Sequence, residues 1–324
     1  MKALALKLSG ALLLLSALLM WASRAPDWPV QTLVARWAPP PSQFIELDGQ
    51  LVHLRDEGPR DDPEPLLLLH GLAGSLHTWE GWARALRSRH RVISVDLPGF
   101  GLTGPSVAAD YSPQADQRFV LALLDRLGVQ RVALGGNALG AELAWRTALL
   151  APARVRRLIL VAATGPQPAP AARSLAASLA RITPLAWLFE SMLPRTLVAA
   201  GLQRAYGDPA RIDADRVDRS WQLLLRAGNR RALVQRLARQ PAAPAPPDAA
   251  ADGASGPGAG PAALRVPTLL LWGERDRITP PALGRQLAAV ITGSRLVVFD
   301  GLGHLPQEED AARTVQPVAA FLAR

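Results

Sequence analysis

Residues 132–141 place an alanine where its surroundings are suited to present a nucleophile. An apolar run ends in the turn Gly136-Asn137-Ala138-Leu139-Gly140, and a helical pattern follows. A glycine-flanked turn between a strand and a helix is how a G-x-S-x-G motif exposes a reactive serine. The glycines permit a strained turn because they add no side chain between the strand and the helix. Ala138 therefore occupies the nucleophile position without a reactive oxygen.

An acid and a base follow this turn, in the chain order nucleophile, acid, base. Asp276 lies just after the apolar run Val266–Trp272, and His304 lies just after the run Leu296–Phe299. In such a triad the histidine takes the proton of the nucleophile, and the acid holds the histidine in the required tautomer. Losing the nucleophile lowers turnover by about 10⁶. The sequence therefore predicts that efficient acyl-enzyme catalysis is absent.

Two further motifs precede the turn and end apolar runs of their own. They are His70-Gly71-Leu72 and the segment Asp96–Gly104, which begins Asp-Leu-Pro-Gly. With the three motifs above, they resemble the α/β-hydrolase superfamily, close to its small esterase and C–C hydrolase members with a helical cap. The resemblance covers roughly residues 44–324. It implies an α/β-hydrolase fold, in which a mostly parallel eight-stranded sheet is flanked by helices and carries an inserted helical cap. It also implies an oxyanion hole made by the backbone N–H groups of Leu72 and Leu139.

Short apolar runs alternate with helical patterns along the chain, which is typical of parallel strands joined by crossover helices. We expect strands at Phe44–Leu47, Val52–Asp56, Leu66–His70, Val92–Asp96, Val132–Gly135, Leu158–Ala162, Thr268–Trp272 and Leu296–Phe299. We expect helices at Trp79–Ser88, Pro113–Leu127, Ala138–Leu150, Pro281–Ala289 and Ala311–Leu322. The third of these helices begins at the glycine-flanked turn, so the nucleophile position lies at its amino end.

Changes in composition divide the chain into six parts. Residues 44–164 and 264–324 are predicted to form the two parts of the hydrolase core. Between them, residues 165–239 are rich in Leu, Ala and Arg and are predicted to form the helical cap. Residues 240–263 consist almost entirely of Ala, Pro, Gly and Asp, a composition typical of a disordered linker. The remaining parts are residues 1–25 and a Pro-rich linker at residues 26–43.

The first 25 residues indicate export or membrane attachment. Lys2 and Lys7 precede the uncharged stretch Leu8–Ala22. This stretch fits the apolar region of a signal peptide and is shorter than the ~20 residues of a full membrane span. Because Pro26 would follow a cleavage site at Ala25, we favour an uncleaved anchor over a removed signal peptide. Positive charge before the stretch then places the folded domain outside the cytoplasm, on the periplasmic side.

The charge and the residue types exclude several classes of function. The net charge of +9 comes almost wholly from arginine, since Lys2 and Lys7 are the only lysines. These arginines are scattered rather than gathered on one segment, so we expect no nucleic-acid partner. The chain has no cysteine, which excludes disulfides and thiol catalysis. The histidines show no spacing that suggests a metal site, and we expect neither a metal nor a cofactor.

Three functions remain open. The first is a hydrolase-family protein whose pocket binds a small to medium apolar ester or carbonyl compound, with weak or lost hydrolysis. The second is a noncatalytic protein that binds a ligand or partner and keeps Asp276 and His304 as relics. The third is a lyase or cofactor-free oxygenase in which the Asp276–His304 pair abstracts a substrate proton. Whether the chain is an enzyme depends on which of these three functions it has. The resemblance implies a protein similar to carboxylic-ester hydrolases, with the nucleophile missing.

Overall fold

The sheet at the centre of the molecule carries all the predicted strands. The structure is a computed structural model, and it describes residues 10, 14, 24–164, 190–239 and 260–323. The strands within these ranges are β1 (Ser42–Leu47), β2 (Gln50–Glu57), β3 (Leu66–Leu69), β4 (Val92–Val95), β5 (Val132–Asn137), β6 (Val155–Val161), β7 (Thr268–Gly273) and β8 (Arg295–Phe299). They form one eight-stranded sheet in the order β1-β2-β4-β3-β5-β6-β7-β8. The predicted α/β-hydrolase fold is confirmed.

The sheet is parallel except at one edge. β2 pairs antiparallel with both β1 and β4, and all other pairs are parallel. Leu69, at the end of β3, pairs with Val95 of β4 on one side and with Gly136 of β5 on the other. Because β3 and β5 are parallel neighbours, the segments that follow them emerge at the same edge of the sheet. The loop after His70 therefore lies beside the turn at Ala138.

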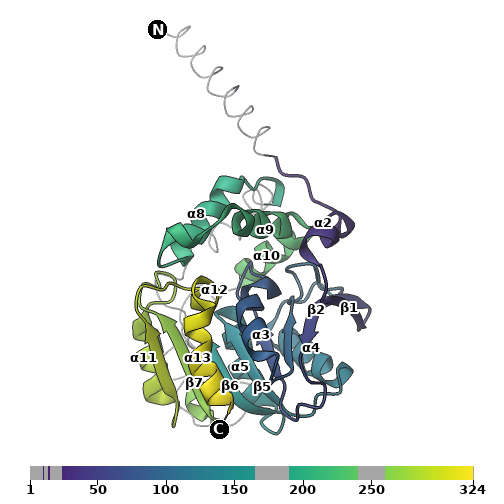
Figure 1. Cartoon of the computed structure of the whole chain (residues 1–324). Helices are drawn as coiled ribbons and strands as arrows, with labels where there is room; N and C mark the ends of the chain where they lie inside the picture. Colours follow the sequence, from purple (N-terminus) through teal and green to yellow (C-terminus); the bar gives the residue numbers. More distant parts are fainter. Residues whose placement is uncertain (1–9, 11–13, 15–23, 165–189, 240–259, 324) are drawn as a thin grey trace.

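Helices cover both faces of this sheet, and all five predicted core helices are present. They are α3 (Glu80–Leu86), α4 (Pro113–Arg126), α5 (Leu139–Leu150), α11 (Pro281–Val290) and α13 (Ala311–Leu322). Figure 1 shows α3 and α13 side by side on one face of the sheet. The two helices can approach closely because Gly81 of α3 has no side chain. A Cβ built on Gly81 would lie 2.2 Å from the Cβ of Ala311. The inner strands β3, β4, β5 and β7 are fully buried, as strands covered on both faces require, whereas the edge strands β1 and β8 are partly exposed.

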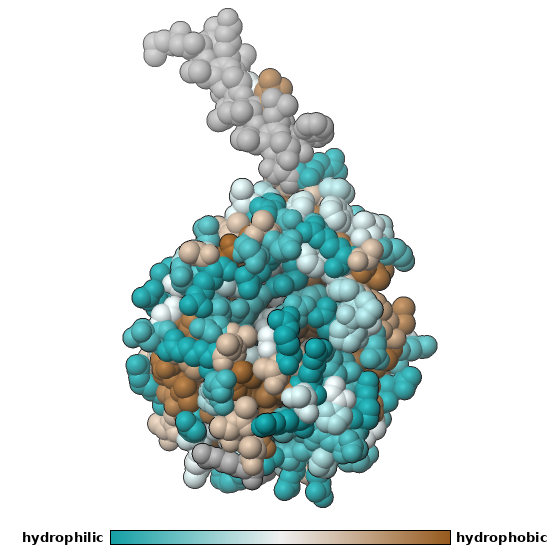
Figure 2. Space-filling view, viewed as in Figure 1, coloured by the Kyte–Doolittle hydropathy of each residue, from teal (hydrophilic) through white to brown (hydrophobic). Residues whose placement is uncertain are grey.

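The described part of the cap is helical, as the composition of that segment predicts. It consists of α8 (Arg195–Ala205), the short 3₁₀ helix η3 (Pro209–Arg211), α9 (Ala214–Leu225) and α10 (Asn229–Arg239). These helices sit above the carboxyl edge of the sheet, and hydrophilic side chains dominate their surface in Figure 2. A buried ion pair fastens α10 to α4, since Nη1 of Arg236 lies 2.7 Å from Oδ2 of Asp116. Residues 165–189, the first part of the predicted cap, lie outside the described residues.

The segment predicted as a Pro-rich linker, residues 26–43, is docked on the cap and contains a helix. Helix α2 (Val30–Trp37) packs Leu33 against Leu223 of the cap and Leu102 of the core. The backbone N–H of Trp28 donates to the carbonyl of Leu225, and the indole N–H of Trp37 donates to Gln222. The Pro-rich linker predicted for residues 26–43 is thus a packed segment, because Leu33 between its prolines is buried against the cap.

The predicted anchor and the predicted disordered linker fall largely outside the described residues. Of residues 1–25 the structure describes only Gly10, Leu14, Arg24 and Ala25. No helix within the described ranges has the length and apolar character needed to cross a membrane. Of residues 240–263 it describes 260–263, where the 3₁₀ helix η5 (Pro261–Ala263) buries Pro261. The predicted linker therefore extends too far at its carboxyl end.

Candidate active site

Ala138 occupies a tight turn in which its backbone has a conformation rarely adopted by alanine. Its φ is 48° and its ψ is −108°, between the end of β5 and the start of α5. Such sparsely populated conformations of non-glycine residues cost about 1–3 kcal/mol. The flanking glycines are sterically required. A Cβ on Gly136 would lie 2.2 Å from the carbonyl carbon of Gly140, and a Cβ on Gly140 would lie 2.1 Å from the carbonyl oxygen of Leu69. The predicted turn is therefore present, and strained, around an alanine.

The predicted acid and base are hydrogen-bonded to each other. Nδ1 of His304 lies 2.9 Å from Oδ2 of Asp276. The other carboxylate oxygen, Oδ1, accepts the backbone N–H groups of Ile278 and Thr279, each at 2.8 Å. Because both carboxylate oxygens of Asp276 accept hydrogen bonds, the orientation of the carboxylate is fixed. No hydrogen bond within the described residues uses Nε2 of His304.

Thr279 is a third member of this group that the sequence analysis did not single out. Its hydroxyl oxygen lies 2.7 Å from Oδ2 of Asp276 and 3.1 Å from Nδ1 of His304. It also lies 3.2 Å from the carbonyl oxygen of Ala162, at the end of β6. The single hydroxyl proton can donate to the Asp276 carboxylate or to the Ala162 carbonyl, and the hydroxyl lies between the acid–base pair and the end of β6. Its position three residues after Asp276 is a signal that the sequence offered.

The turn at residue 138 lies next to the loop that bears His304. The side-chain amide of Asn137 donates to the carbonyl oxygen of His304 at 3.1 Å, and residue 137 is buried. Ala138 itself is 8% exposed. The residue before Ala138 is therefore hydrogen-bonded to the backbone of the residue that forms the pair with Asp276.

The predicted oxyanion loop passes over the same turn. A Cβ built on Gly71 would lie 3.5 Å from the Cβ of Ala138. Leu139 is the first residue of α5, and the N–H groups of a first helical turn have no partner within the helix. The backbone N–H of Leu72 likewise has no partner among the residues that the structure describes. The N–H groups of Leu72 and Leu139 are thus unpaired among the described residues, and they belong to two segments that meet at residue 138.

A buried histidine and aspartate hold this loop in place. Nδ1 of His70 lies 2.7 Å from the carbonyl oxygen of Gly71, and its Nε2 accepts the N–H of Leu97 at 3.0 Å. Burial lowers the pKa of His70, so the ring remains neutral and can both donate and accept. Oδ1 of Asp96 accepts the N–H of Leu76 at 2.7 Å. The loop after β3 is thereby fixed by side chains at the ends of β3 and β4.

The Asp96 carboxylate is also paired with a second buried histidine. Oδ2 of Asp96 lies 2.7 Å from Nδ1 of His53, and both side chains are fully buried. Burial alone would raise the pKa of Asp96, but the adjacent His53 and its hydrogen bond outweigh that effect and hold the pKa well below its ordinary value. This pair lies on the β2 side of the sheet and has no contact with His304. It is part of the scaffold of the loop.

No group suited to hold a metal occurs in the described ranges, which contain no cluster of three or more His, Cys, Asp or Glu side chains. A cavity of about 310 Å³ lies between α2, α9 and the start of α3. It is lined by arginines that already have carboxylate partners, such as Arg55, whose Nη1 lies 2.6 Å from Oε1 of Glu80. Neither Ala138 nor the Asp276–His304 pair lines it. We assign this cavity no ligand.

Comparison with known proteins places the chain in a family. A model of the alpha/beta hydrolase fold matches residues 64–311. The chain belongs to the α/β-hydrolase family. This match includes all five motifs and extends from β3 to the start of α13.

Within the α/β-hydrolase family, the chain is similar to several named hydrolases. A 2-hydroxy-6-oxononadienedioate/2-hydroxy-6-oxononatrienedioate hydrolase of Klebsiella pneumoniae is 29% identical over 298 residues, which cover 87% of this chain and 96% of the relative. A hydrolase of the same name, numbered 2, from Pseudomonas putida is 31% identical and covers 86% of this chain and 93% of its own. A solved meta-cleavage product hydrolase from Pseudomonas fluorescens, a serine-to-alanine mutant complexed with acetates, has a TM-score of 0.70 at 22% identity. It covers 87% of this chain and 97% of its own, and it shows the shared fold.

Proposed function

We propose that this chain is an α/β-hydrolase-family protein whose pocket binds a small to medium ester-like or carbonyl compound and whose hydrolytic turnover is weak or lost. The observation that carries the proposal is the strained turn at Ala138, with φ 48° and ψ −108°, beside a hydrogen-bonded Asp276–His304 pair. The strained turn and the hydrogen-bonded acid–base pair support a site related to those of acyl transfer, in which a nucleophile, a base and an acid act together. Binding and polarisation of a carbonyl group are therefore retained, while formation of an acyl-enzyme is not.

The class of ligand follows from the oxyanion arrangement and from the relatives. Two backbone N–H groups, those of Leu72 and Leu139, suit a carbonyl oxygen on which negative charge develops. The relatives named above are hydrolases of 6-oxo dienedioates, in which a ketone is part of a short carbon chain. Small ketones and short esters share the group that these N–H donors recognise. We expect the ligand to come from this class.

The experiment compares the natural chain with Ala138→Ser on p-nitrophenyl acetate and butyrate. The natural chain should hydrolyse both esters barely above buffer. Ala138→Ser should raise turnover by about 10⁴–10⁶-fold, because it restores the one missing group. The matched control is the double variant Ala138→Ser with His304→Ala, which should show no gain. Equal rates for the natural chain and Ala138→Ser would contradict an ester or carbonyl site.

A second function, proton abstraction from a substrate carbon, is favoured by the integrity of the acid–base pair. His304 keeps its bond to Asp276, the Thr279 hydroxyl lies beside both, and Nε2 of His304 is unpaired among the described residues. An imidazole held in this way serves as a general base without a serine. The test is deuterium uptake from D₂O, above the rate in buffer alone, at the carbon next to the carbonyl of small monoketones, followed by NMR. His304→Ala should abolish the uptake and Ala138→Ser should retain it, and uptake unaffected by His304→Ala would exclude this function.

We further propose that the folded domain is exported and held at a membrane by residues 1–25. The support is the pattern of Lys2 and Lys7 before the apolar stretch Leu8–Ala22. The docking of Arg24 and Ala25 on the cap, at Met192 and Ser191, gives such an anchor a fixed point of attachment to the fold. Recovery of the full-length chain in the soluble periplasmic fraction, rather than with membranes, would contradict this proposal.

A further inference from the structure

Glu309 joins the loop that carries His304 to the cap. It is the last residue of α12 (Pro306–Glu309) and is 8% exposed. Its Oε1 accepts the backbone N–H of Gly303 at 2.7 Å. Its Oε2 accepts the backbone N–H of Gly207, in the turn after α8, at 2.8 Å. One buried carboxylate therefore binds the residue directly before His304 with one oxygen and the cap with the other.

The two segments that Glu309 joins are already in direct contact. The backbone N–H of His304 donates to the carbonyl oxygen of Ala205, the last residue of α8, at 2.6 Å. A Cβ built on Gly303 would lie 2.4 Å from that same oxygen and 2.4 Å from the nitrogen of Gly207. A Cβ on Gly207 would lie 2.7 Å from the nitrogen of Gly303. Glycine is required at both positions because the backbones touch.

We propose that Glu309 is a positioning residue for His304: by fastening Gly303 to Gly207 through its two carboxylate oxygens, it makes the placement of the imidazole depend on the placement of the cap. Hydrogen bonds to an ionised carboxylate are about twice as strong as neutral ones. They hold the backbone on the amino side of His304, while Asp276 and Thr279 hold the ring. Displacing the cap at Gly207 would therefore move the base away from residue 138.

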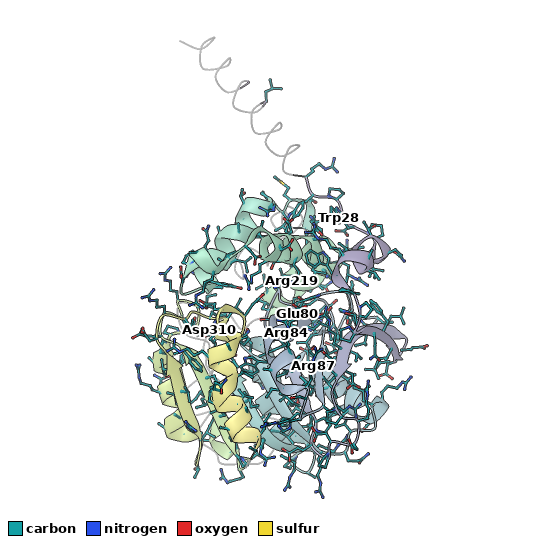
Figure 3. All side chains as sticks on the ribbon, in the orientation of Figure 1. Trp28, Glu80, Arg84, Arg87, Arg219 and Asp310 are labelled. Atoms are coloured by element: carbon teal, nitrogen blue, oxygen red, sulfur yellow. The ribbon has the colours of Figure 1, made fainter. Side chains whose placement is uncertain are left out.

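The neighbouring Glu308 provides a matched control, because it contacts the cap without touching the His304 loop. Its carboxylate pairs with Arg219 of α9 and lies 3.1 Å from the hydroxyl of Thr78. Figure 3 shows Arg219 at the lower edge of the cap, above Glu80 at the start of α3, with Asp310 at the start of α13. Glu308 and Glu309 are thus adjacent carboxylates of one helix, and both fasten the cap. Only Glu309 also binds the residue before the base.

The first test uses the natural chain and requires no turnover. Glu309→Gln keeps the shape of the side chain but turns one oxygen into an N–H₂ group, which opposes a backbone N–H. The ¹⁵N and ¹H NMR signals of the His304 ring should shift or broaden. Amide hydrogen exchange at Gly303 and Gly207 should accelerate at least tenfold, because the variant loses one charge-assisted hydrogen bond. Glu308→Gln should leave the His304 ring signals in place and change both exchange rates less than twofold.

The second test rests on the proposed function and uses the Ala138→Ser background. Adding Glu309→Gln should lower kcat for p-nitrophenyl acetate at least tenfold with KM changed less than twofold, and adding Glu308→Gln should leave kcat within twofold. If Ala138→Ser has no activity, the proposed function fails while the NMR comparison still decides the role of Glu309. His304 signals that are unchanged in a folded Glu309→Gln, or equally changed in Glu308→Gln, overturn the inference.

A shorter carboxylate keeps the inference testable if Glu309→Gln does not fold. Glu309→Asp retains the charge but is one methylene too short to reach both Gly303 and Gly207. It should perturb the His304 ring signals in the same direction as Glu309→Gln, by a smaller amount. Unchanged ring signals in a folded Glu309→Asp would overturn the inference as well.

Discussion

Replacing Ala138 by glycine should reveal the strain that the turn stores. An alanine held at φ 48° and ψ −108° carries a conformational cost of about 2 kcal/mol, the middle of the range for such residues. Glycine removes this cost because it has no Cβ. The same change also loses about 1 kcal/mol through the greater freedom of glycine in the unfolded chain. It loses up to about 0.8 kcal/mol more with the buried methyl group. These opposing effects leave Ala138→Gly close to neutral.

The matched control is Ala144→Gly, in the middle of α5. Ala144 is 0% exposed, and its helical backbone carries no comparable strain. This variant loses the methyl group and the backbone restriction without relieving strain, so it should destabilise the fold by about 2 kcal/mol. Urea titration followed by circular dichroism gives the free energy of unfolding of each variant. The expected difference between the two variants is about 2 kcal/mol. Equal losses would show that the turn at residue 138 stores no strain.

Two further predictions concern the scaffold around the site. Burial lowers the folded-state pKa of His77 to about 4. The unfolded chain then binds the proton more tightly, so the stability supplied by neutral His77 is complete above about pH 6.5 and is lost as the pH falls towards 4. From pH 7 to pH 5 the natural chain should lose about 2 kcal/mol more unfolding free energy than His77→Gln, and identical pH profiles would contradict burial of a neutral ring. Asp116→Ala leaves the buried Arg236 without its carboxylate partner and should lower the free energy of unfolding in urea by about 3–5 kcal/mol. Asp218→Ala, which breaks an exposed ion pair with Arg195, should lower it by less than about 1 kcal/mol. Similar losses for the two would mean that the Arg236 pair does not fasten the cap to α4.

The strands and core helices could be predicted from the sequence because their signals are local. A parallel strand that is buried on both faces needs a continuous apolar run. Leu66–Leu69 and Thr268–Trp272 are such runs, and both are buried strands in the structure. The turn at Ala138 could also be predicted from the sequence, because its two glycines are required by contacts with residues nearby in the chain and with β3. Local constraints of this kind leave a pattern in the sequence.

The elements that the sequence analysis missed depend on contacts between distant segments. Helix α2 has eight residues, too short to be stable alone, and it exists because Leu33 packs between the cap and the core. The role of Glu309 depends on Gly207, which lies in another part of the chain. Thr279 is close enough to Asp276 to be suspected, but its contact with Ala162 appears only in the folded protein. Composition and spacing carry no information about such pairings.

Labelling with a fluorophosphonate probe reports directly whether residue 138 occupies a nucleophile position, because the probe reacts with a serine that a neighbouring base activates. We expect no labelling of the natural chain, rapid labelling of Ala138→Ser at residue 138 by mass spectrometry, and loss of that labelling when His304→Ala is added. Labelling of the natural chain would reveal a nucleophile elsewhere. An unlabelled Ala138→Ser in a correctly folded protein would mean that residue 138 does not face the imidazole of His304, and it would contradict the account.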